Sequence, residues 1–230
     1  MVKLIHKWVS TYASLCRQGR EQSSLCPRCA STVETEDHVL ICSDEKAKTY
    51  RTTLLQTFLR SLLAMHTPIH IIDCFEYKLS LALDLVYSKQ FYTATSLPAD
   101  QNRILLDAIK HQNIIGWDLF IRGFTSSKWI DVFNAIRTHD CRHRQHWDVT
   151  LISGVLTLLK GILDDCNRTL HGATRIEAAQ KLWERVLQRT RELYSRPPKL
   201  HPRYAKITTI SADERMKRST MYLMRWLARG

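Results

Sequence analysis

Three cysteines and one histidine near the N-terminus are spaced as the ligands of one metal ion would be: Cys26, Cys29, His38 and Cys42, in the pattern C-x2-C-x8-H-x3-C. Two cysteines separated by two residues can place both sulfur atoms on one cation from a tight turn. A histidine and a cysteine four positions apart face the same side of a helix. Three sulfur atoms and one ring nitrogen make a closed tetrahedral set, which suits structural Zn²⁺ and leaves no position for a substrate. The pattern therefore predicts a structural zinc site. The alternative is four unrelated residues in a reduced protein with seven cysteines.

The residues before the second ligand pair predict the helix that positions it. Thr35 stands three residues before His38, where an N-cap residue stands, and Glu36 and Asp37 favour a helix N-terminus. We therefore expect the second ligand pair, His38 and Cys42, to lie on the first turn of a helix. Cys16 is the one substitute ligand that we consider for this site.

Three features follow one another in residues 4–42. A Trp-containing segment, Leu4–Trp8, comes first, then the turn Cys26-Pro27-Arg28-Cys29, then the acidic run Glu34–Cys42 with its Asp-His pair and final cysteine. This order resembles the zinc-binding segment that follows the polymerase part of many retroelement reverse transcriptases. Two shorter segments, Ile115–Gly123 and Leu170–Thr174, resemble blocks in the C-terminal regions of such polyproteins. The resemblance implies the tail of a retroelement polyprotein, or a gene derived from one.

Composition indicates a globular, strongly basic protein. The 230 residues are 44% hydrophobic and include only seven glycines and six prolines, which argues against a turn-rich all-β fold. The net charge of +12 and the pI of about 9.5 favour polyanionic partners, nucleic acid first. The alternative is a basic protein without a nucleic-acid partner, which charge alone does not exclude.

The cysteine number and the absence of a long apolar run bear on location. Seven cysteines, three of them assigned to the metal, fit a reducing compartment better than a disulfide framework. No apolar run is long enough to span a bilayer. We expect an intracellular protein, in the nucleus or the cytoplasm, with no membrane or small-molecule partner.

Apolar residues recur at helical spacing along most of the chain, and strand signals are nearly absent. The predicted fold is all-α: a multi-helix bundle with a small N-terminal zinc-binding segment. The expected helices cover residues 2–17, the segment from Cys42 to Met65, 69–90, 99–115, 128–137, 143–170, 174–194 and 211–229. The expected parts are residues 1–66 with the metal site, 67–196 as the helical bundle, and 197–230 as a basic linker and helix.

The clearest helix pattern lies between His143 and Leu170. Five apolar residues on one stripe are predicted to be buried: Trp147, Leu151, Val155, Leu158 and Ile162. Gly172 is placed to end this helix, and Thr174 with Glu177 predicts a capping box for the next.

Basic residues concentrate in the last fifth of the chain. Residues 185–230 contain twelve arginines and lysines against three acidic residues, with four aromatic residues between the charges: Tyr194, Tyr204, Tyr222 and Trp226. Backbone neutralisation together with base stacking is how single strands are held without sequence readout. The predicted nucleic-acid contacts are Arg185, Arg189, Arg191, Lys199, Arg203, Lys206, Arg215, Lys217 and Arg218. The alternative is a solvated basic face on ordinary helices whose aromatic residues lie in the core.

No catalytic constellation is recognisable. Asp164 and Asp165 are adjacent and point to different helix faces, which suits a polar helix surface better than paired-carboxylate catalysis. The segment Cys166–His171 lacks the arginine that an all-helical ribonuclease of the HEPN type carries at the required spacing. The cluster His139–His146 is rich in ligand types but follows no metal-site spacing. The sequence thus favours a non-catalytic, zinc-binding, nucleic-acid-binding accessory region, with a helical protein-interaction or structural module as the alternative.

Overall fold

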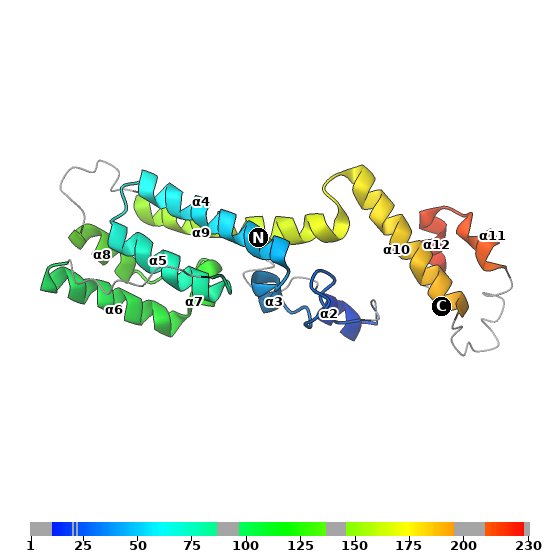
Figure 1. Cartoon of the computed structure of the whole chain (residues 1–230), viewed down its shortest axis with the longest axis horizontal. Coiled ribbons are helices and arrows are strands. Elements are labelled where there is room, and N and C mark those ends of the chain that lie inside the picture. The colour runs from blue at the N-terminus through cyan, green and yellow to red at the C-terminus, as the bar shows by residue number, and fades with distance from the viewer. Residues whose placement is uncertain are drawn as a thin grey trace. The chain divides into compact units, whose positions relative to one another are not determined.

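The computed structural model describes residues 11–19, 21, 23–86, 97–136, 146–195 and 210–227. Over these ranges the chain forms eleven helices, α2 to α12, and one isolated antiparallel bridge between Leu25 and Val33, with no strand (Figure 1). The all-α prediction is confirmed. Of the helix expected over residues 2–17, the described part is α2, Tyr12–Arg17. The cluster His139–His146 lies outside the described residues apart from its last member.

The chain divides into two compact units, Met1–Cys166 and Asn167–Gly230, and each is treated by itself. The division groups the chain differently from the three parts expected from the sequence. Leu55, from the first expected part, shares one hydrophobic core with Ile71 and Leu158, from the second. Because these residues exclude water together, residues 11–166 have no internal boundary at position 66.

The first unit contains α2 and the helices that position the candidate site. Their bounds are α3 Glu36–Ile41, α4 Glu45–Ala64, α5 Ile69–Ala82, α6 Ala99–Ile115, α7 Trp117–Ile121, α8 Lys128–Ile136 and α9 Trp147–His171, the last continuing into the second unit. Asp44 begins α4 as a new helix, because its carboxylate accepts a hydrogen bond from the Ala47 amide at 2.9 Å. The helix expected to reach residue 90 ends at Ala82, a correction to the sequence prediction.

Aromatic rings fill the centre of the first unit. The Phe75 ring lies 4.7 Å from the ring of Trp129 and 5.1 Å from that of Phe120, in tilted and edge-on arrangements that aromatic pairs favour. Phe133 and Trp147 stack at 4.6 Å. The residues of this core come from α3 through α9, and α3 contributes Leu40. Cys26, Cys42 and Ala47 form a separate, smaller cluster.

The predicted buried stripe of the longest helix is confirmed. Its five residues, Trp147, Leu151, Val155, Leu158 and Ile162, are all buried. On α9, Gly154 and Gly161 allow close approach of α4, which runs beside it in Figure 1. A Cβ atom at Gly154 would lie 2.9 Å from Cδ2 of Phe58, and one at Gly161 would lie 2.8 Å from Cδ1 of Leu54. Small residues are therefore required at these contacts.

The second unit contains α10 Arg175–Ser195, α11 Ala212–Met216 and α12 Thr220–Leu227. Gly172 ends α9 at φ +91°, and Thr174 Oγ1 accepts a hydrogen bond from the Glu177 amide at 3.1 Å, as predicted. The single helix expected over 211–229 is wrong, because two helices are present. Ser219 separates them: its hydroxyl accepts a hydrogen bond from the Tyr222 amide at 3.3 Å and so starts a second helix.

Candidate metal centre

The first ligand pair lies in a tight turn closed by backbone hydrogen bonds. The Ala30 amide donates to the Cys26 carbonyl at 2.8 Å, and the Cys26 amide donates to the Thr32 carbonyl at 2.7 Å. Ala30 has φ +53°, a left-handed conformation that lets the chain reverse within the turn. The bridge between Leu25 and Val33 holds the two arms together. The short Cys-Pro-Arg-Cys spacing thus produces the loop that it predicts.

The second ligand pair is positioned by α3. Thr35 is its N-cap, since its hydroxyl accepts a hydrogen bond from the His38 amide at 3.1 Å. His38 is therefore on the first turn, and Cys42 follows directly after the last helical residue. The position of His38 is the one predicted from Thr35 and the acidic residues that follow it. Cys42 is predicted on the same first turn but lies beyond the helix, because a turn spans about 3.6 residues and α3 ends at Ile41.

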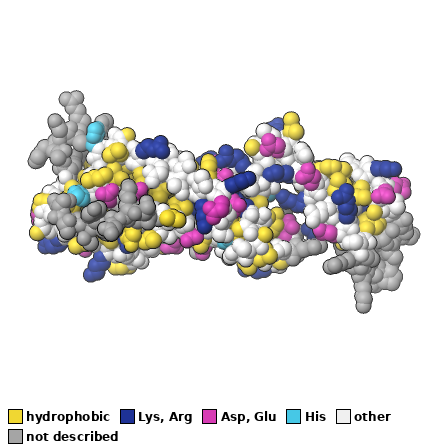
Figure 2. Space-filling view, viewed as in Figure 1, with side chains coloured by type: hydrophobic (Ala, Val, Ile, Leu, Met, Phe, Trp, Pro, Cys, Tyr) yellow, Lys and Arg dark blue, Asp and Glu magenta, His cyan; other side chains and the backbone are white. Residues whose placement is uncertain are grey.

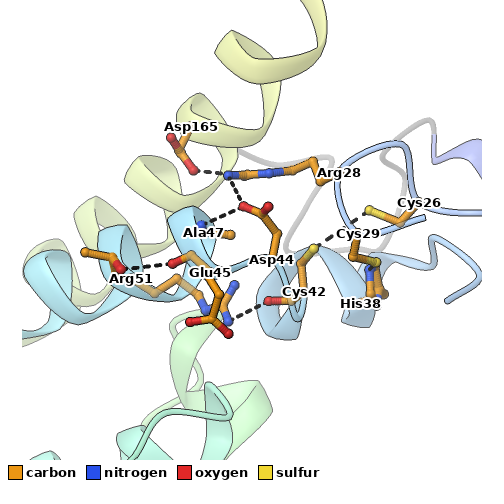
Figure 3. A network of polar contacts seen from close by, with 11 residues as sticks. Cys26, Arg28, Cys29, His38, Cys42, Asp44, Glu45, Ala47, Arg51 and Asp165 are labelled. Atoms are coloured by element: carbon orange, nitrogen blue, oxygen red, sulfur yellow. Dashed lines mark hydrogen bonds and ion pairs between the residues drawn. The ribbon is translucent and has the colours of Figure 1, made fainter. Parts of the chain in front are cut away.

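The four side chains converge. Their candidate ligand atoms all lie within 4.8 Å of one another, with Cys26 Sγ 3.8 Å from Cys42 Sγ and Cys29 Sγ 3.4 Å from His38 Nε2 (Figure 3). A tetrahedron with metal–sulfur bonds of about 2.3 Å has sulfur–sulfur edges of about 3.8 Å. All three cysteines are free thiols, so a disulfide does not account for their approach. These residues could hold a metal ion. Cys16, the substitute ligand considered above, is not among them.

The three cysteine thiols differ in pKa because their surroundings differ. Burial raises the pKa of Cys26 to about 12, although the amides of Cys29 and Arg28 favour its thiolate. Burial also raises the pKa of Cys42. For Cys29 burial acts in the same direction, but hydrogen bonds from Ser31, Thr32 and Ser43 outweigh it and lower the pKa to about 5. Amides directed at sulfur are a common outer shell of thiolate metal sites.

Arg28 fastens the turn to the helical body. Its Nη1 donates to Asp165 of α9 at 2.8 Å, and its Nη2 lies 3.4 Å from Asp44 (Figure 3). Asp44 also caps α4, so one carboxylate serves the turn and the helix start. The side chain of Arg28 is only 7% exposed, which makes this contact less screened than an ordinary surface ion pair.

Two buried arginines of the bundle contact the same segment. Arg51 of α4 donates from Nη2 to the Cys42 carbonyl at 2.8 Å, and Arg122, directly after α7, donates from Nη2 to Asp37 of α3 at 2.7 Å. Burial lowers the pKa of Arg51, whereas the neighbouring Cys42 favours its charged form. Three thiolates and one divalent cation would leave one net negative charge, which these cations are placed to balance.

Glu34 ties α2 to the same centre. It is 3% exposed, its carboxylate accepts a hydrogen bond from the Tyr12 amide at 2.7 Å, and its carbonyl accepts one from the Ala13 amide at 3.2 Å. Burial raises the pKa of this carboxyl group. Sequence reasoning missed the supporting roles of Glu34 and of the arginines, because tertiary contacts at long sequence separation leave no local pattern.

The described residues that were predicted to contact nucleic acid differ in exposure, and not all of them lie at the surface. Lys199, Arg203 and Lys206 lie outside the described residues. Arg191, Lys217 and Arg218 are exposed, whereas Arg185 and Arg189 are partly buried. Arg215 is 3% exposed and therefore belongs to the interior of its unit, which differs from the surface role predicted for it. Figure 2 shows cationic, anionic and hydrophobic side chains interspersed on the face in view.

Two cations of α10 donate hydrogen bonds to carbonyl groups at the C-terminal end of α9. Lys181 Nζ donates to the Thr169 carbonyl at 2.5 Å, and Arg185 Nη2 donates to the Leu170 carbonyl at 3.4 Å. Side-chain donors of this kind satisfy the last carbonyl groups of a helix. His171 beside them is exposed overall, and partial desolvation lowers its pKa, with both cations adding to that effect.

The adjacent carboxylates of α9 form ion pairs with separate partners: Asp164 pairs with Lys160 one turn away, and Asp165 pairs with Arg28.

Among the described helices, none has both the length and the apolar character needed to cross a membrane. Comparison with known protein families, with curated proteins and with solved structures finds no match for this chain.

Proposed function

We propose that the chain is a non-catalytic nucleic-acid-binding module whose N-terminal segment is held to a helical body by one structural Zn²⁺. The observation that carries the proposal is the partition of charge between the two units. Residues 167–230 contain fifteen lysines and arginines against five acidic residues, a net charge of +10. Residues 1–166 contain nineteen against seventeen, a net of +2. One unit contains the candidate metal centre, and the other contains nearly all of the basic excess.

The donor set supports zinc as the ion. Three thiol sulfur atoms and one imidazole nitrogen are soft or borderline ligands, which favour Zn²⁺ over Mg²⁺ or Ca²⁺. The four donors come from the chain itself and would complete a tetrahedral shell, as structural zinc sites do. Cys26, Cys29, His38 and Cys42 would hold the ion and so join the turn to α3. Arg28, Arg51 and Arg122 would then fasten both to the bundle.

The charge of the second unit supports a polyanion as the partner. Exposed cations on it include Arg168, Arg175, Arg191, Lys217, Arg218 and Arg225. Cations that neutralise phosphates release counterions, so binding free energy from this source weakens steeply with salt. The acidic residues near the metal ligands, Glu36 and Asp37, make the metal segment a poor candidate for the same contact.

The test is a titration of the zinc-loaded chain with labelled single-stranded and duplex oligonucleotides at several salt concentrations. Each phosphate contact should add about 0.7 to the log–log slope for a single strand. Substituting serine for Lys217 and Arg218 should lower the slope without changing helix content. Arg60→Ser together with Arg103→Ser, at two exposed cations of the first unit, is the matched loss of two cations and should leave the slope unchanged. No binding at about 50 mM salt, where phosphate contacts are only weakly screened, would refute the proposal.

A second candidate function, a protein-interaction module, is favoured by a separate observation. The described basic residues are divided between α10 and the α11–α12 region, and one of them is buried. Helices of the first unit also expose large apolar side chains, among them Leu63, Ile69, Leu81, Leu106 and Ile114. A protein partner captured equally well at high and low salt would favour this function. The retroelement origin is likewise a proposal, supported by the ligand spacing of residues 26–42.

A further inference from the structure

Two described aromatic residues of the second unit, Tyr194 and Trp226, are used for its own packing, whereas a third, Tyr222, is exposed. Tyr194 of α10 and Trp226 of α12 stack at 5.9 Å between ring centroids. Arg215 stacks on the Trp226 ring, with its guanidinium carbon 4.2 Å from the ring centre. Its Nε donates a hydrogen bond to the Tyr194 hydroxyl at 2.8 Å. That hydroxyl donates to the Ile210 carbonyl at 2.6 Å. These rings hold α10, α11 and α12 together and are therefore not available to a ligand.

Tyr222 has a different environment. Its side chain is 41% exposed on α12, while the next residue, Leu223, is fully buried and fixes which side of the helix faces the protein. The guanidinium of Arg218 lies 5.9 Å from the centre of the Tyr222 ring, within the range of a cation–π contact. Arg225 stands three residues further on, one turn along the same side of the helix. The exposed ring thus lies between two cations.

The charged residues that neighbour Tyr222 in the sequence are all cationic. Lys217, Arg218 and Arg225 are exposed, and no acidic residue occurs between positions 217 and 227. An aromatic ring alone would suit many apolar partners, and cations alone would suit any polyanion. A ring between cations suits a partner that presents flat bases at regular spacing along a chain of phosphates. A duplex hides the faces of its bases, so the partner that fits is a single strand.

We propose that Lys217, Arg218, Tyr222 and Arg225 form a contact surface for a single-stranded polynucleotide. One base stacks on the Tyr222 ring, and the three cations contact the phosphates beside it. This inference rests on the proposed nucleic-acid-binding function and names the site and the strandedness of the ligand. Stacking on a ring does not distinguish the four bases, so the surface binds without sequence preference.

The experiment is fluorescence anisotropy with the full zinc-loaded chain and 20-nucleotide probes: oligo(dT), oligo(U) and a duplex of the same length. Tyr222→Ala should weaken single-strand binding about 5- to 150-fold, the range for one base–aromatic stack, and leave the salt slope unchanged. Tyr222→Phe keeps the ring and should bind like the original chain. Met221→Ala removes an exposed, non-aromatic neighbour that is 59% exposed and should have little effect.

Variants of the three cations test the phosphate contacts through the salt dependence of binding. Serine at positions 217, 218 and 225 together should lower the single-strand salt slope by about 2, because each lost phosphate contact removes about 0.7. The difference in affinity between oligo(dT) and oligo(U) shows whether single-stranded DNA or RNA is the preferred ligand. Either preference supports the proposed contact surface. Circular dichroism of each variant checks that helix content is kept.

The failure of this inference differs from the failure of the proposed function. If the original chain binds single strands but Tyr222→Ala binds equally well, the surface is overturned and the nucleic-acid-binding function stands. Equal affinity for the duplex, indifferent to Tyr222, also overturns the surface. If the original chain binds none of the three probes, or binds poly-glutamate as tightly and without dependence on the ring, the nucleic-acid function falls with it.

Discussion

The ion pair between Arg28 and Asp165 should be the main electrostatic connection between the metal-binding turn and α9. The two side chains are 7% and 20% exposed and meet at 2.8 Å. Hydrogen bonds to charged groups contribute about 1.5–3 kcal/mol, and low exposure reduces screening by water and salt. We therefore expect a coupling energy of about 1.5–3 kcal/mol from a double-mutant cycle of Arg28→Ala and Asp165→Ala. The cycle isolates this pair from the second contact of Arg28 with Asp44.

A matched control lies beside it on the same helix. Lys160 and Asp164 form an ion pair with side chains that are 62% and 49% exposed. Exposed pairs four residues apart on a helix contribute about 0.3–0.5 kcal/mol. Urea unfolding of the metal-loaded chain, followed by tryptophan fluorescence, measures both cycles. An Arg28–Asp165 coupling no larger than that of the control would refute the docking role of Arg28.

Further outcomes follow from the packing and from one titrating group. Leu158→Ala should lower the free energy of unfolding by about 2–5 kcal/mol, whereas alanine at the exposed Thr157 should change it little; urea unfolding compares them. Gly154→Ala should destabilise the protein although alanine favours a helix by about 1 kcal/mol, because overpacking against the Phe58 ring costs about 1–3 kcal/mol; a more stable variant would contradict the close approach of α4 and α9. The pKa of the exposed His171 is lowered by partial desolvation and by Arg185 and Lys181, so the unfolded chain takes up its proton first and stability should fall slightly as pH drops through about 6.5. His171→Gln should remove this part of the pH dependence of thermal unfolding, and an unchanged profile would contradict the assignment.

The metal-binding segment and α9 could be predicted from the sequence because their signals are local. The ligand spacing, the Thr35 cap and the i, i+4 recurrence of apolar residues each lie within a few turns of chain. The docking of the segment could not be predicted in this way. Arg28 and Asp165 are 137 positions apart, and Arg122 and Asp37 are 85 apart. Only the fold brings such pairs together.

In the basic C-terminal region, amino-acid composition does not predict which cations are exposed. In the sequence Arg215 resembles the surface cations around it, yet it is buried, because its planar guanidinium can stack on the Trp226 ring while its Nε donates to the Tyr194 hydroxyl. The helix expected over 211–229 is divided because Ser219 caps a new helix at Thr220, and amphipathic spacing is insensitive to such a break. Net charge therefore indicated the unit that bears the cations, and the structure distinguished the cations available at its surface.

The proposed zinc site can be tested by X-ray absorption at the zinc edge, combined with metal analysis of the purified chain. We expect one Zn²⁺ per chain with three sulfur atoms at about 2.3 Å and one nitrogen at about 2.0–2.1 Å. Cys42→Ser should lose one sulfur from that shell, whereas Cys16→Ser should leave it unchanged, since Cys16 lies outside the cluster. A chain that purifies without zinc and does not take it up, or a bound ion with a shell of oxygen atoms, would rule out the structural zinc site.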